Sequence, residues 1–93
     1  MEINKVVAAL DSNIRREMLR ILSKDPMNVV EVLEELKRRK FEVKYRETVY
    51  RGLEKLLEAG LVDKSYVKNK GLCYKLTANR IIIDVTKDSI EKF

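Results

Sequence analysis

The chain has 93 residues, of which 45% are hydrophobic and 38% are charged, and its net charge is +5. This length suits one domain over residues 1–93, and no apolar run approaches the roughly 18 residues of a membrane span, so no membrane partner is expected. One cysteine cannot form an intrachain disulfide, no signal peptide is visible, and the charged composition favours a cytoplasmic protein. Histidine, the commonest general base and transition-metal ligand, is absent.

Two short helices are predicted before the single proline. Residues 3–10 look like a short helix, and Asp11-Ser12 can cap a second one. This second helix covers residues 12–23, where apolar residues fall at i, i+4, i+7 and i+8. Pro26 marks its end, because proline disfavours helical geometry in the residue before it.

A third helix is predicted over residues 29–39, with Asn28 as its N-cap and apolar residues at i, i+3, i+4 and i+7. The four cations at residues 37–40 suit the C-terminal end of this helix, where the helix dipole favours positive charge. Residues 41–44 then form a turn that is longer than the tightest helix-turn-helix connection.

The fourth predicted helix, residues 45–59, is the most informative segment. Its inner stripe is apolar, and Arg46 and Tyr50 lie four residues apart on its outer side. Gly52 costs about 1 kcal/mol relative to alanine inside a helix, which either close packing or the close approach of a phosphate would explain. Gly60 suits the left-handed position that ends a helix.

Two strand-like runs, residues 61–68 and 72–77, flank a three-residue hairpin loop at residues 69–71, with Gly71 at positive φ. Helices followed by a hairpin in this order predict an α+β fold. This fold is a winged helix-turn-helix, mainly helical with a C-terminal β-hairpin wing, and it typically places one helix in the major groove of DNA.

The tail after this hairpin has two interpretations. Residues 81–85 are rich in β-branched side chains, which favours a strand, and Thr86 could then cap a short terminal helix ending at Phe93. The alternative is one continuous helix from residue 78.

Positive charge is concentrated in two neighbouring segments. Residues 37–55 have eight basic and three acidic groups, and residues 61–77 have four basic groups and one acidic group. Residues 1–36, in contrast, have five basic and seven acidic groups. The predicted fourth helix, its approach and the hairpin therefore carry the positive field, which favours a polyanionic partner over an ordinary solvated surface.

Two stretches resemble a known family. Residues 6–22, VVAALDSNIRREMLRIL, are similar to the opening of ArsR-like winged-helix transcription regulators, especially small archaeal ones. Residues 48–62, TVYRGLEKLLEAGLV, resemble the recognition helix of that family and its turn into the wing, a pattern shared with PadR-like and MarR-like regulators. The resemblance covers about residues 3–77. It implies a dimeric repressor or activator that binds a pseudo-palindromic operator in double-stranded DNA.

The sequence departs from that family where metal-sensing members hold their metal. Those members use cysteine pairs and clusters of histidine and carboxylate, whereas here Cys73 stands alone and histidine is absent, so neither a metal nor a cofactor is expected. No nucleophile–base pair or phosphate-binding glycine loop is visible, so an enzyme is not expected. Cys73 is interpreted as a small buried hydrophobe, with redox sensing as the alternative.

The fourth helix is expected to enter the major groove, with the hairpin against the flanking DNA backbone. Arg46 is assigned to base reading and Arg51 to a phosphate; the alternative is that Arg51 only pairs with Glu47 and Tyr50 is half-buried. Core packing is the alternative for Tyr45, and a solvated loop is the alternative for the wing tip. The predicted DNA-contacting residues are Lys44, Tyr45, Arg46, Thr48, Tyr50, Arg51, Lys68, Asn69 and Lys70.

The two ends of the chain hold apolar residues with no obvious place in the predicted core. Residues of about 1–10 and 78–93 are therefore expected to form a homodimer interface. The rival function is a winged helix used as a protein–protein interaction module in a larger complex, which would tolerate loss of Arg46 and Arg51. The predicted interface residues are Ile3, Val6, Val7, Leu10, Ile81, Ile82, Ile83, Ile90 and Phe93.

Overall fold

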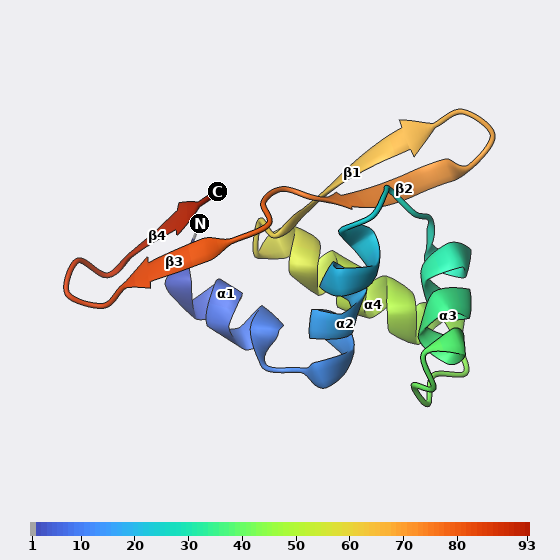
Figure 1. Cartoon of the computed structure of the whole chain (residues 1–93), viewed down its shortest axis with the longest axis horizontal. Helices are drawn as coiled ribbons and strands as arrows, with labels where there is room; N and C mark the ends of the chain where they lie inside the picture. Colours follow the sequence, from blue (N-terminus) through green and yellow to red (C-terminus); the bar gives the residue numbers. More distant parts are fainter. Residues whose placement is uncertain (1) are drawn as a thin grey trace.

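The computed structural model describes residues 2–93, which form four helices followed by two β-hairpins (Figure 1). This is the predicted α+β winged-helix architecture, and the helices and the first hairpin begin and end within one residue of their predicted bounds. The helices are α1 (Ile3–Leu10), α2 (Asn13–Leu22), α3 (Val29–Arg38) and α4 (Arg46–Glu58); the strands are β1 (Val62–Val67), β2 (Gly71–Leu76), β3 (Ile81–Asp84) and β4 (Ser89–Lys92).

Polar side chains form hydrogen bonds with backbone groups at several helix ends, as the sequence predicts at Ser12 and Asn28. The Ser12 hydroxyl accepts a hydrogen bond from the backbone N–H of Arg15 and so caps α2 (3.2 Å). The α3 N-terminus is a complete capping box, in which Asn28 and Glu31 each accept from the other's backbone N–H (2.8 and 2.9 Å). The Arg15 guanidinium donates to the carbonyls of Ala8 and Ala9 at the C-terminal end of α1 (3.0 and 2.8 Å), where the Ala8 carbonyl also accepts from the backbone N–H of Asp11 (3.3 Å).

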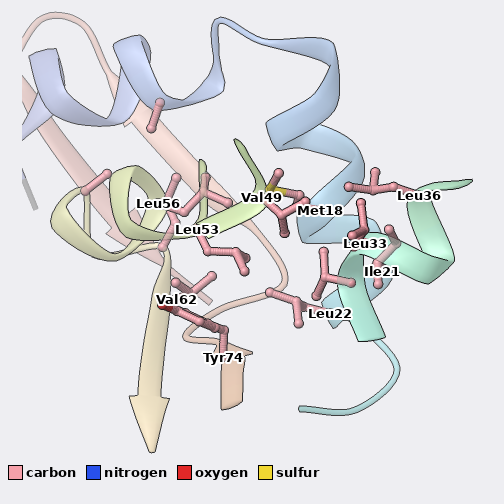
Figure 2. Close-up of a cluster of buried hydrophobic side chains, with 14 of the residues drawn as sticks. Met18, Ile21, Leu22, Leu33, Leu36, Val49, Leu53, Leu56, Val62 and Tyr74 are labelled. Carbon is pink, nitrogen blue, oxygen red and sulfur yellow. The ribbon is translucent and has the colours of Figure 1, made fainter. Parts of the chain in front are cut away.

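The core lies where α2, α3 and α4 converge under the base of the first hairpin (Figure 2). Met18 of α2 and Leu53 of α4 are fully buried there, and Tyr74 of β2 closes the core from the hairpin side. A Cβ atom at Gly52 would lie 2.8 Å from the Met18 Cε atom. The absence of a side chain at Gly52 thus serves the packing of α4 on α2, which decides between the two interpretations of this glycine.

The first hairpin is the wing, a two-stranded antiparallel sheet of β1 and β2. Lys64 pairs with Tyr74 and Tyr66 with Leu72, so these four side chains share one face of the wing. Gly71 adopts the predicted positive φ (86°). An isolated antiparallel bridge between Met27 and Tyr74 joins β2 to the α2–α3 connection.

The tail confirms one prediction and overturns two. Residues 81–84 form the predicted strand, but the terminal helix capped by Thr86 is wrong, as is the continuous helix from residue 78, because β4 returns antiparallel to β3. The Asp84 carboxylate accepts hydrogen bonds from the backbone N–H and hydroxyl of Thr86 (3.1 and 2.8 Å) and from the Lys87 N–H (3.1 Å). Thr86 therefore belongs to a turn that reverses the chain.

The predicted interface residues range from fully buried to exposed. Val6 is fully buried in the core of its own chain, so its assignment to an interface is wrong. Leu10, Ile81 and Ile90 are partly buried against the same core, because α1 and the second hairpin pack on it. Ile3 is half-buried, whereas the remaining four predicted interface residues are exposed: Val7, Ile82, Ile83 and Phe93.

Candidate nucleic-acid interface

The N-terminal half of α4 projects cationic and aromatic side chains to solvent. Tyr45, at the N-cap, is 70% exposed, which excludes the core-packing alternative, and its side chain makes no capping hydrogen bond. Lys44, Arg46 and Thr48 are exposed beside it, whereas Val49 points into the core. The first turn of a helix leaves backbone N–H groups without helical acceptors, so this end of α4 is suited to phosphate oxygens.

Three outward-facing side chains of α4 differ in how they are held. Arg51 pairs with Glu47 at 2.7 Å, but both side chains are at least 70% exposed, so the pair is weak and a phosphate could replace the carboxylate. Arg46 makes no ion pair within residues 2–93. Tyr50 is exposed at 46%, so about half of its side-chain surface is still covered by the protein.

A groove of about 540 Å³ runs between α4, the start of α3 and the distal part of the wing. Arg46 and Tyr50 line it from α4, Val30 from α3 and Leu72 from β2. Val30 and Leu72 are 40% and 57% exposed, so the floor of the predicted contact surface is partly apolar. Apolar side chains beside an arginine suit the major groove, where thymine methyl groups lie next to hydrogen-bonding base edges.

The three predicted DNA-contacting residues of the wing tip differ in whether their side chains face solvent. Lys68 and Asn69 are exposed at the turn. Lys70 is directed inward: its ammonium group donates to the Pro26 carbonyl at 2.6 Å and lies 3.3 Å from the Glu31 carboxylate. The Asn28 amide also donates to the Lys70 carbonyl at 2.9 Å, so Lys70 fastens the wing to the start of α3.

A cluster of Glu54, Lys64 and Tyr74 joins α4 to the wing, and the sequence analysis did not identify it. The Glu54 carboxylate accepts from the Tyr74 hydroxyl at 2.5 Å and from the Lys64 ammonium at 2.9 Å. The hydrogen bond from Tyr74 is the main reason why the pKa of Glu54 is lowered, and burial with this bond raises the pKa of Tyr74. Strand alternation was the available signal, since it places Lys64 on one face with buried Val62.

Residues 2–93 contain no group of three or more Cys, Asp or Glu side chains that could hold a metal ion. Cys73 is 1% exposed and burial raises the pKa of its thiol, which favours its interpretation as a buried hydrophobe over redox sensing. Among residues 2–93, no helix has the length and apolar character needed to cross a membrane.

No protein-family model and no curated sequence matches the chain. Its structure is similar to a manganese uptake regulator (22% identity, TM-score 0.59, covering 88% of this chain and 63% of the other). It is also similar to the ferric uptake regulator of Francisella tularensis with iron (24%, TM-score 0.61, 88% and 66%) and that of Pseudomonas aeruginosa with manganese (21%, TM-score 0.65, 100% and 75%). The chain thus spans about two thirds of the length of the first two.

These likenesses, all below 25% identity, establish the winged-helix fold. The similar structures are ferric and manganese uptake regulators, so the resemblance to ArsR-like regulators remains a prediction from the sequence. The iron and manganese named with these structures belong to those proteins.

Proposed function

We propose that this chain is a sequence-specific DNA-binding transcription regulator that acts as a dimer on a pseudo-palindromic operator. The observation that carries the proposal is the exposed N-terminal half of α4, with Arg46 and Lys44 beside a basic wing. The fold supports it, because a winged helix offers one helix to the major groove and a hairpin to the flanking backbone.

In this proposal, Arg46 reads a base edge, and Tyr50 and Arg51 contact phosphates from the same helix face. Lys44, Tyr45 and Thr48 approach the backbone at the α4 N-terminus. Lys68 and Asn69 supply the wing contacts, whereas Lys70 acts through the wing, since its ammonium group is already engaged by Pro26 and Glu31. No catalytic group, metal or cofactor is required.

The second copy is proposed to pack against the tail hairpin. Ile82, Ile83 and Phe93 remain 39–56% exposed there, and Val85 is 85% exposed. Val7 of α1 is exposed as well, at 51%. Exposed apolar side chains grouped in one region mark an interface, and a two-fold dimer presents its reading helices roughly 34–36 Å apart, one turn of DNA.

Selection from a random duplex library with the purified protein tests this proposal. Enriched sequences should contain two related half-sites, and their affinity, measured by fluorescence anisotropy, should fall steeply with salt as counterions are released. A scrambled duplex of equal length is the control. Absence of duplex affinity at low salt would contradict the proposal.

The alternative function is that of a protein–protein interaction module in a larger complex. The double variant Arg46→Ala/Arg51→Ala distinguishes the two functions: it should abolish operator binding if the chain binds DNA, but should leave a protein partner bound if the chain is an interaction module. Both arginines are exposed, so the double variant is expected to fold.

A further inference from the structure

We propose that Glu54 is a positioning residue that holds Lys64 and the wing in the arrangement needed for DNA contact, although its own charge has the wrong sign for a DNA-binding surface. This inference rests on the proposed function, because it assigns a role within that same surface. Glu54 lies on α4 one turn after Tyr50, and its side chain is 27% exposed.

One carboxylate oxygen of Glu54 joins three elements. It accepts hydrogen bonds from the Tyr74 hydroxyl of β2 and the Lys64 ammonium of β1 (2.5 and 2.9 Å). The Tyr74 backbone in turn exchanges two hydrogen bonds with Met27 in the α2–α3 connection (2.8 and 3.1 Å). Tyr74 therefore links α4 to both the wing and the start of the α3 segment.

Lys64 connects this hydrogen-bonded cluster to Tyr50, which is one of the predicted DNA-contacting residues. Its ammonium group lies 5.6 Å from the centroid of the Tyr74 ring and 6.0 Å from that of the Tyr50 ring. Both distances are within the range of a cation–π interaction. Lys64 held by Glu54 thus fixes a cation beside Tyr50, and without Glu54 the long lysine side chain recovers its rotamer freedom.

Because Glu54 is negatively charged, its removal should change DNA affinity in opposite directions under the two explanations. Removing a carboxylate from a surface that faces DNA should strengthen binding if electrostatics alone acts, because phosphate repulsion falls. Loss of a positioning contact should weaken it. Glu58, also on α4, is exposed and makes no ion pair within residues 2–93, so it supplies a matched control with the same change of charge.

The experiment compares Glu54→Gln and Glu58→Gln for affinity to the selected operator, with circular dichroism to establish that both variants are folded at the assay temperature. Glu54→Gln should lose on the order of tenfold in affinity, about 1.4 kcal/mol, whereas Glu58→Gln should bind as well as the wild type or better. Tyr74→Phe, which removes only the hydroxyl, should weaken binding, and Tyr66→Phe on the exposed end of the same face should not.

A further comparison separates positioning from general stability. Lys64→Met should weaken binding in the wild type but add little in the Glu54→Gln background, because the two residues act as one unit. Equal or tighter binding by Glu54→Gln than by Glu58→Gln would overturn the inference while leaving the proposed function intact.

If the wild type binds no duplex, the proposed function fails, and amide hydrogen exchange tests the contact itself. Glu54→Gln should then speed exchange in β1 and β2 relative to Glu58→Gln. Unchanged protection of both strands would overturn the positioning role.

Discussion

At the scale of single residues, the arginines show how contacts divide side chains of one type among different tasks. Arg15 donates to two carbonyls at the C-terminal end of α1, and Arg39 bridges Glu17 and Glu35 between α2 and α3. Arg46 has no ion-pair partner within residues 2–93, and Arg51 has one exposed and weak partner. Of these four arginines, Arg46 and Arg51 are therefore the ones whose guanidinium groups can turn toward an external anion, because Arg15 and Arg39 are held by other groups of the protein.

Alanine substitutions at Arg46 and Arg51 should have different effects. Arg46→Ala should cost about 1–3 kcal/mol on the preferred site and relax selectivity at one base position, because a bidentate contact to a base edge is lost. Arg51→Ala should weaken all sequences by similar factors. Binding of a panel of single-base operator variants measures both effects, and equal, sequence-independent losses would contradict the base-reading role of Arg46.

The wing lysines form a second matched pair. Lys68→Ala should reduce the slope of log affinity against log salt by about 1, because one phosphate contact is lost. Lys70→Ala should leave that slope nearly unchanged but lower the unfolding free energy by about 1 kcal/mol, because its bonds to Pro26 and Glu31 disappear. Salt titration and urea unfolding of both variants check this prediction; a larger slope change for Lys70→Ala than for Lys68→Ala would contradict it.

At the scale of elements, an ion-pair network joins α2 to α3. Arg39 of the α3 C-cap lies 2.6 Å from Glu17 of α2 and 3.1 Å from Glu35, and Glu17 also pairs with Arg20 at 2.7 Å. Glu17 is only 13% exposed, so solvent screens this network less than the exposed pair on α4. The hydrogen bond from Arg39 is the largest influence on Glu17 and holds its pKa below the ordinary 4.5, although burial opposes it.

Stability should therefore depend on the ionisation of Glu17. A carboxyl whose pKa is lower in the folded state stabilises the fold above its unfolded pKa, and this contribution is lost as the pH falls. Glu17→Gln should cost about 1–3 kcal/mol at pH 7, and this difference from the wild type should shrink as the pH drops below 4.5. Urea unfolding across this range measures it, with exposed Glu34→Gln as the control; the same pH dependence in both variants would contradict the prediction.

At the scale of the whole molecule, the two hairpins serve different surfaces. The wing folds back toward the α2–α3 connection, whereas the tail hairpin lies beyond α1 at the other end of the molecule (Figure 1). The proposed DNA-contacting face of α4 and the exposed apolar side chains of the tail thus lie on separate parts of the fold. This separation would allow one chain to meet DNA and a second copy at the same time.

Truncation after Thr77 tests the role of the tail hairpin. The shortened chain should lose self-association and operator affinity while its helices remain folded, because the main core side chains all lie before residue 78. Sedimentation at micromolar concentration and circular dichroism check the two parts. The single substitution Ile82→Asp should also weaken self-association without unfolding the chain, because Ile82 is 51% exposed, unlike the fully buried Val6. A full-length chain that sediments as a monomer would contradict the two-fold operator model.

Periodicity in the sequence determined the helices and the wing, because apolar stripes and capping residues such as Asn28 act within a few residues of one another. In the tail, the turn at Asp84 is local, because it is held by hydrogen bonds to residues two and three positions on. The pairing of β4 with β3, which periodicity could not show, was decided by the tertiary structure. The inward direction of Lys70 and the Glu54–Lys64–Tyr74 cluster join residues 10 to 44 positions apart. By composition, Lys64 and Lys70 count as surface cations, but the packing of the wing on α3 and α4 decides that both bind groups of the protein itself.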